Sequence, residues 1–195
     1  MGERMHFAAA AAVLTLIAGA AAPSAAQTDL EPLLSQARAA ATRRDYPAAI
    51  EALQRALEEA RRAAPLAIEK FMVVAEPAKS YGAYAARKNA EFHGKDPAHF
   101  YLEPKNLVYP KTTDGSYKPA FDVGFEIVDK DGNSVAKEER FGSFQFVSQS
   151  ALQDIYVNLH LNFEGAPPGA YEVRFTVKDV NSGKTATVKQ PFKVI

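Results

Sequence analysis

Apolar residues in the first part of the chain recur at the spacing of a helix. Two sets share this spacing: Leu30, Leu33, Leu34, Ala37 and Ala40, and Ile50, Leu53, Ala56, Leu57 and Ala60. Residues three and four apart lie on one face of a helix, so each set predicts an amphipathic helix. Asp29 suits the N-cap of the first helix, and Asp45 followed by Pro47 suits the start of the second.

From Phe71 onward the apolar pattern has a period of two. It is clearest in residues 121–127, 155–163 and 171–177, and each of these segments is followed by a turn sequence rich in Gly, Pro, Asn or Asp. Further strands are expected at 71–75, 84–92, 100–107, 142–147 and 185–194. Seven or eight antiparallel strands, each with one apolar face and no helix between them, predict a two-sheet β-sandwich.

The chain changes character at Pro65, where Ala, Arg, Glu and Leu give way to Val, Phe, Tyr, Thr and Gly. We therefore expect a mainly β protein with an N-terminal α-hairpin. The expected parts are a signal peptide at 1–26, a helical hairpin at 27–64 and a β-sandwich domain at 65–195.

The N-terminal segment has the pattern of a secretory signal peptide. Arg4 precedes an apolar run from Phe7 to Ala22, and Pro23 and small residues follow it. The alternative is an uncleaved membrane anchor, but the run is shorter than the roughly 20 apolar residues of a membrane span. We therefore favour a cleaved signal peptide and expect no stable membrane insertion after its cleavage. The chain has no cysteine, which excludes disulfides, thiol chemistry and a lipidated cysteine. These features predict a periplasmic or secreted bacterial protein.

The balance of acidic and basic residues indicates which classes of partner the protein can bind. Lys and Arg together number 23, as do Asp and Glu, and no dense basic run occurs. Phosphate binding needs concentrated positive charge, so the sequence predicts no nucleic acid partner.

The segment "RRDYPAAIEALQRALEEA" resembles the turn and second helix of a tetratricopeptide repeat. The matching residues are Asp45, Tyr46, Ala49, Ile50, Leu53, Ala56 and Leu57. Arg44 stands where the turn glycine is usual, and no second repeat follows. A lone repeat cannot bury its own apolar face, which must pack on the β-domain, on a second subunit or on a partner protein. We favour the β-domain, because open apolar patches are costly, and interpret Tyr46 and Leu53 as structural.

The C-terminal segment "PGAYEVRFTVKDVNSGKTATVKQPFKV" resembles the closing strands of immunoglobulin-like modules in bacterial exported proteins. The matching elements are Pro168-Gly169, Tyr171, Val177, Asp179, Ser182-Gly183-Lys184 and Phe192. Such modules usually bind, space or dock, so the resemblance implies a binding role without naming a partner.

The sequence offers few residues for chemistry. His93, Asp96 and His99 could gather on one loop as ligands for zinc or copper, but Gly94 and Pro97 indicate a turn in which polar residues need no ligand. We therefore predict no metal and no other cofactor. Nucleophile elbows, phosphate-binding loops and dinucleotide fingerprints are absent from the sequence, which predicts that the protein is not an enzyme.

Tyrosines offer broad contact area, and Tyr81, Tyr84, Tyr101 and Tyr109 are the predicted partner-binding residues. The sequence thus favours an exported, non-enzymatic protein-binding or accessory module of the bacterial cell envelope, whose partner is another envelope protein. The alternative is a small-ligand binding protein that holds a metal through His93 and His99, or a carbohydrate through exposed tyrosines.

Overall fold

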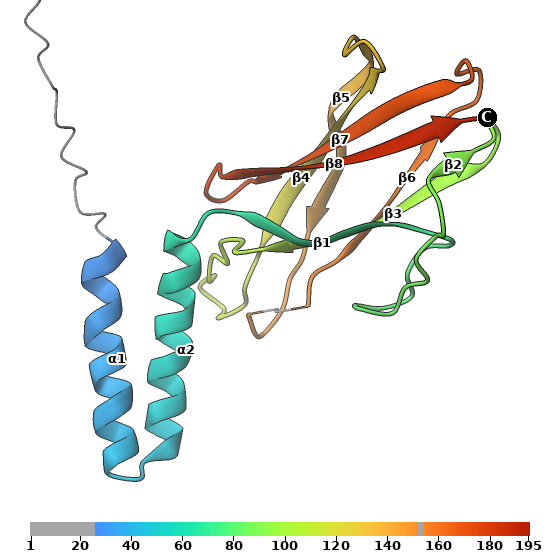
Figure 1. Ribbon diagram of the computed structural model, residues 1–195. Helices are drawn as coiled ribbons and strands as arrows, with labels where there is room; N and C mark the ends of the chain where they lie inside the picture. The colour runs from blue at the N-terminus through green and yellow to red at the C-terminus, as the bar shows by residue number, and fades with distance from the viewer. Residues whose placement is uncertain (1–25, 152–153) are drawn as a thin grey trace, which may run out of the picture.

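The computed structural model describes residues 26–151 and 154–195, which form an α-hairpin followed by a β-domain (Figure 1). The expected signal peptide lies, apart from Ala26, outside the described residues. Within the described ranges, neither helix has the length and apolarity needed to cross a membrane.

The hairpin consists of α1 (Ala26–Thr42) and α2 (Tyr46–Ala63). Asp45 caps α2 as expected, since its side chain accepts a hydrogen bond from the backbone N–H of Ala48 at 3.3 Å. Helix α1 already begins at Ala26, before the cap expected at Asp29. The turn between the helices places Arg44 at φ 60°, in the left-handed region that a glycine usually occupies.

The β-domain contains eight strands among the described residues. They are β1 (Ala67–Val74), β2 (Glu91–Phe92), β3 (Pro97–Lys105), β4 (Ala120–Asp129), β5 (Ser134–Gln145), β6 (Val157–Asn162), β7 (Gly169–Asp179) and β8 (Thr185–Val194). One sheet has the order β1-β3-β6, and the other has the order β2-β8-β7-β4-β5. All neighbours pair antiparallel except β2 and β8. A mainly β protein with two N-terminal helices and two mostly antiparallel sheets is therefore confirmed.

Both sheets contribute side chains to one hydrophobic core. Phe100 of β3 and Phe175 of β7 meet edge to face, with ring centroids 5.0 Å apart. Alternate residues of each central strand supply the rest, as with Val157, Leu159 and Leu161 on β6. The two-residue period predicted these buried positions because only one face of each strand turns toward the core.

Two strand predictions need correction. Residues 84–92 form a strand only at Glu91–Phe92, because the segment before it folds across the outer face of the three-stranded sheet and stacks Tyr84 on Tyr101. The strand expected at 142–147 is instead the C-terminal part of β5, which begins at Ser134. Residues 134–140 are exposed on both faces, so no alternation marks them in the sequence.

Candidate functional site

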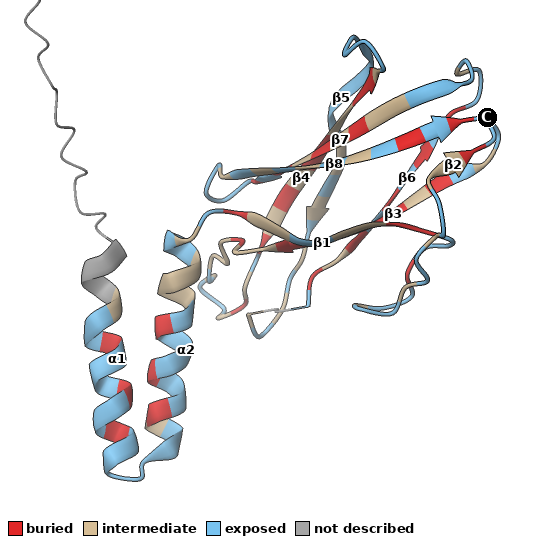
Figure 2. Cartoon of the chain, in the orientation of Figure 1, coloured by how far each residue is buried: buried red, intermediate tan, exposed pale blue. Residues whose placement is uncertain are grey.

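Five of the nine exposed large hydrophobic residues in the described part of the chain lie on the hairpin. Alanines line the contact between the helices, with Ala49, Ala52 and Ala56 of α2 buried there. The larger residues of α2 lie beside this seam and stay open to solvent, with relative exposures of 60% for Tyr46, 55% for Ile50, 51% for Leu53 and 47% for Leu57. We call these four residues the apolar stripe. Figure 2 shows the buried residues where the helices face each other and exposed residues over most of the remainder.

Small side chains in the seam explain why the large ones remain outside. Leu33, Ala37 and Ala40 of α1 are buried with the three alanines of α2, so one large side chain and five small ones already fill the contact between the helices. The apolar stripe is turned away from this contact. A face built in this way can be buried only by a further element.

Leu34 of α1 extends the apolar stripe across the hairpin. Successive residues of a helix are rotated by about 100° around its axis. Leu34 therefore lies roughly a quarter turn around α1 from the residues that contact α2. Ile50 and Leu57 lie at a similar rotation around α2 from the residues that contact α1. Because the helices run antiparallel, the same sense of rotation leads to the same side of the hairpin. Leu34 and the apolar stripe therefore form one surface.

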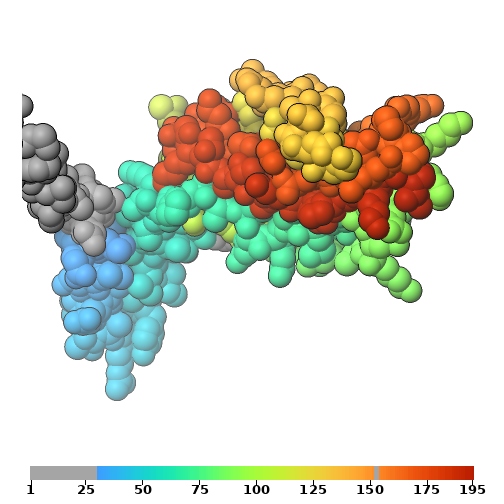
Figure 3. Space-filling view, turned by 45° about the horizontal axis from the view of Figure 1, so that its top comes forward, coloured from blue at the N-terminus to red at the C-terminus, as the bar shows by residue number. Residues whose placement is uncertain are grey.

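The favoured packing of this surface on the β-domain is not observed. The hairpin projects from the β-domain, as the space-filling view shows (Figure 3). Contact is made at the C-terminal end of α2, where Lys184 Nζ donates hydrogen bonds to the carbonyls of Arg62 and Ala64. Tyr117 Oη also donates to Glu58 Oε1 at 3.5 Å. A lysine ammonium at a helix C-terminus complements the helix dipole, so this joint fixes the end of α2 without covering the stripe.

The predicted tyrosine set is spread over different environments. Tyr101 is fully buried under the loop that follows β1, where its hydroxyl donates to Glu103 Oε1 at 2.6 Å and accepts from Gly82 N–H at 2.8 Å. Burial raises the pKa of Tyr101. Tyr101 therefore stabilises the loop and offers no contact surface. Its strand alternation points it away from the core, and the sequence does not reveal the loop that covers it.

The remaining predicted tyrosines are half-buried. Tyr81 accepts a hydrogen bond from Lys105 Nζ at 2.9 Å, and Tyr84 stacks on Tyr101 with ring centroids 4.6 Å apart. Tyr109 lies beside the end of α2, and burial raises its pKa. The four tyrosines do not form one binding face.

The candidate metal ligands are also separated by the fold. His93 and Asp96 close a turn, with His93 N–H donating to Asp96 Oδ2 at 3.2 Å. His99 lies on β3 opposite His160 of β6, with ring centroids 6.4 Å apart. Burial, His160 and Arg87 lower the pKa of His99. Nowhere in the described parts of the chain do three or more His, Cys, Asp or Glu side chains gather as a metal site would require.

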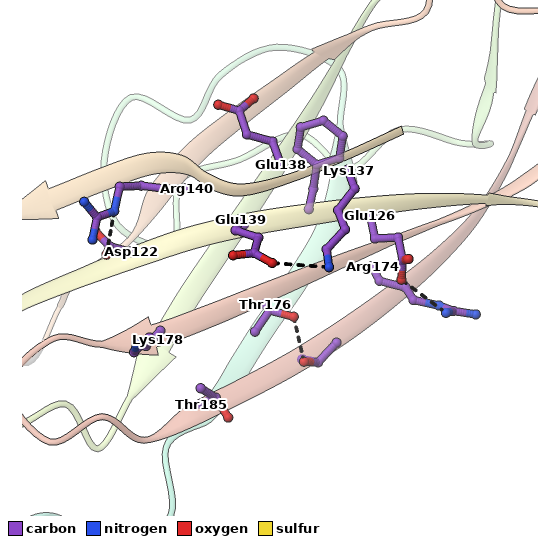
Figure 4. A pocket seen from close by; sticks show the side chains of 13 residues that line it. Asp122, Glu126, Lys137, Glu138, Glu139, Arg140, Arg174, Thr176, Lys178 and Thr185 are labelled. Atoms are coloured by element: carbon purple, nitrogen blue, oxygen red, sulfur yellow. Dashed lines mark hydrogen bonds and ion pairs between the residues drawn. The ribbon is translucent and has the colours of Figure 1, made fainter. Parts of the chain in front are cut away.

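A second surface is the charged groove on the outer face of the five-stranded sheet (Figure 4). It has a volume of about 750 Å³ and is lined by β4, β5, β7 and β8. Its charges pair within the groove, as between Arg140 and Asp122 at 3.1 Å and between Arg174 and Glu126 at 3.4 Å. Neighbouring opposite charges screen one another, so the groove has no strong preference for an anion or a cation.

No protein-family model matches the chain, and no curated protein matches it. The similar solved structures include the Pseudomonas fluorescens alkylpurine DNA glycosylase AlkC bound to DNA containing an abasic site analog. The TM-score is 0.38 and the sequence identity is 13%, over 77% of this chain and 39% of that chain. The chain thus spans well under half the length of that structure.

This comparison contradicts two predictions made from the sequence. The sequence predicts a protein that is not an enzyme and that has no nucleic acid partner, whereas the similar structure is a glycosylase bound to DNA. Neither prediction is kept. A likeness with this TM-score carries no argument for glycosylase activity or DNA binding in this chain.

Proposed function

We propose that the chain is a protein-binding module of the bacterial cell envelope, in which an immunoglobulin-like sandwich carries a single tetratricopeptide-like hairpin. The binding surface is the apolar stripe together with Leu34. The observation that carries the proposal is the exposure of Ile50, Leu53 and Leu57, each about half open to solvent on one side of α2.

The free-energy cost of leaving this apolar surface in water favours the binding of a partner. Burying apolar area stabilises by roughly 25 cal/mol for each Å² removed from water. Contiguous apolar patches on soluble monomers are commonly sites of protein contact. The partner that fits is an amphipathic helix, because its own apolar side chains can pack against the apolar stripe.

The contact between Lys184 and the end of α2 supports a role of the β-domain as the carrier of the hairpin. Lys184 joins the start of β8 to the end of α2, so the hairpin is attached to the sheet as well as to the chain leading into β1. The assignment to the cell envelope rests on the N-terminal sequence pattern. The immunoglobulin-like assignment rests on the strand pattern and the C-terminal resemblance.

The alternative of a small-ligand binding protein gains no support from these positions. His93 lies in a turn, while the His99 ring lies against His160, and Tyr101 is buried. The protein-binding proposal is therefore preferred.

In-cell crosslinking of the tagged, exported chain tests the proposal. Leu53→Glu places a carboxylate in the apolar stripe, and Arg55→Glu places the same group on the opposite side of α2 as a matched control. We expect one specific crosslinked protein, whether an envelope protein or a second copy, with the wild type and with Arg55→Glu, and its loss with Leu53→Glu. Equal capture by all three chains, or no capture by any, contradicts the proposal.

A further inference from the structure

We infer that the occupant of the apolar stripe is a second copy of the same chain, with α2 packed antiparallel on α2 of its partner. This inference rests on the proposed function, because it names the protein that the binding surface takes. Spacing, area, charge and the position of the β-domain carry it.

The apolar stripe is self-complementary. Tyr46, Ile50, Leu53 and Leu57 are separated by intervals of four, three and four residues, and this order reads the same in both directions. Antiparallel packing places a two-fold axis perpendicular to α2, at the level between Ile50 and Leu53. This axis sets Ile50 opposite Leu53 of the second copy. It also sets Tyr46 opposite Leu57 of the second copy. Alternating intervals of three and four are the spacing of helix pairs that pack knobs into holes.

The exposed area meets the requirement of a small stable dimer. A large apolar side chain offers about 200 Å² when fully exposed, so Leu34 and the apolar stripe together expose on the order of 500 Å² per copy. Two copies would bury roughly 1,000 Å², the lower limit for a specific interface. Leu30, which is half-buried on the same side of α1, adds to this contact.

The charges of the hairpin permit self-association. Residues 27–64 contain as many acidic as basic residues, and the whole chain has a formal net charge of zero. Two copies therefore do not repel one another. The ion pair between Glu59 and Arg62 at 3.4 Å lies on the other side of α2, so packing along the stripe leaves it in solvent.

The β-domain leaves room for this arrangement. It contacts α2 near Glu58, Arg61 and Arg62, at the C-terminal end of the helix and on the side away from α1. Antiparallel packing sets the two C-terminal ends at opposite ends of the four-helix contact. The two β-domains would therefore lie far apart and would not clash.

Sedimentation velocity of the purified exported chain over a wide concentration range tests the inference. We expect a dimer for the wild type and for Arg55→Glu, and a monomer for Leu53→Glu. Circular dichroism of each variant checks that the helices remain folded. A dimer that Leu53→Glu leaves intact overturns the inference, because the contact would then lie elsewhere.

Disulfide formation between introduced cysteines tests the antiparallel orientation of the two α2 helices. The chain has no native cysteine that could form competing disulfides. Chains carrying Tyr46→Cys and Leu57→Cys, each with a different tag, are mixed and oxidised. The antiparallel arrangement predicts disulfides between the two kinds of chain in preference to disulfides between like chains. If disulfides form mainly between like chains, the two helices pack in parallel, and the inference is overturned.

The outcomes separate this inference from the proposed function. A wild-type monomer that still captures an envelope protein through Leu53 overturns the second copy as occupant and leaves the binding surface in place. A monomer that captures nothing through Leu53 overturns both.

Discussion

Leu53 and Ala56 lie one turn apart on α2, yet Ala56 is 4% exposed and Leu53 is 51% exposed. The smaller side chain fills the contact with α1, and the larger one faces solvent. One face of α2 is thus covered by α1, and the face that carries Leu53 is open to solvent.

Enlarging the seam should therefore destabilise the hairpin. Ala56→Leu forces a larger side chain into a contact that buried residues of both helices already fill, and we expect it to lower the free energy of unfolding by about 1–3 kcal/mol. The control is Leu57→Ala, which removes an exposed side chain and should cost the isolated chain far less. Urea unfolding followed by far-UV circular dichroism measures both, and equal costs would show that the seam is not closely packed.

The turn between the helices holds avoidable strain. Arg44 adopts φ 60°, which costs a residue with a Cβ about 1–2 kcal/mol more than glycine. Arg44→Gly should raise the unfolding free energy by about 0.5–1 kcal/mol, since the greater freedom of glycine in the unfolded chain offsets part of the gain. Arg43→Gly is the neighbouring control and should give no gain. A loss of stability in Arg44→Gly would contradict the account of the turn.

Gly124 permits the irregular pairing of β4 with β5. A Cβ at this position would lie 2.6 Å from the carbonyl oxygen of Glu139, where the register between the strands shifts. Gly124→Ala should destabilise the β-domain by about 1–3 kcal/mol, because backbone must move to admit the methyl group. At Gly169 the nearest atom would be 3.5 Å away, on the side chain of Tyr171. Gly169→Ala should therefore be much milder, and similar thermal shifts for the two variants would contradict the prediction.

The pair of His99 and His160 predicts acid sensitivity. Burial, followed by the charges of His160 and Arg87, lowers the pKa of His99 from its usual 6.5, and its Nδ1 is buried without a hydrogen-bond partner. The unfolded chain then binds a proton near pH 6.5 that the folded chain resists. The stabilisation is present above this pH and is lost as the pH falls through 6.5 toward the lowered pKa.

Unfolding free energies measured between about pH 7.5 and pH 5 test this sensitivity. We expect the wild type to lose stability across the range and His99→Phe to show a shallower slope. An unchanged slope in the variant would mean that another group governs the acid response.

The sequence predicted those parts of the fold in which one face is buried. Strands β4, β6, β7 and β8 each alternate apolar and polar residues, so their faces could be read from the chain. The start of β5 has no such pattern because both of its faces meet solvent. Tyr101 points away from the core but is buried by a distant loop, and local periodicity carries no signal for that contact.

The candidate site was predicted only in part, for a related reason. Periodicity shows that Ile50, Leu53 and Leu57 share a side of α2, but it does not show what covers that side. The favoured interpretation placed the β-domain there, and the structure shows the side open. The hydrogen bond between Lys184 and Ala64 joins residues far apart in the chain, so no local sequence pattern predicts it.

The central claim is that another protein covers the apolar stripe in the cell, and cysteine labelling tests it most directly. Leu53→Cys and the control Arg55→Cys each introduce the single cysteine of an otherwise cysteine-free chain. Their reaction with a maleimide is compared in intact cells and in dilute purified protein. The account predicts slow labelling of Leu53→Cys in cells, fast labelling after dilution, and fast labelling of Arg55→Cys in both. Equally fast labelling of the two cysteines in cells would show that the stripe is open there and would contradict the account.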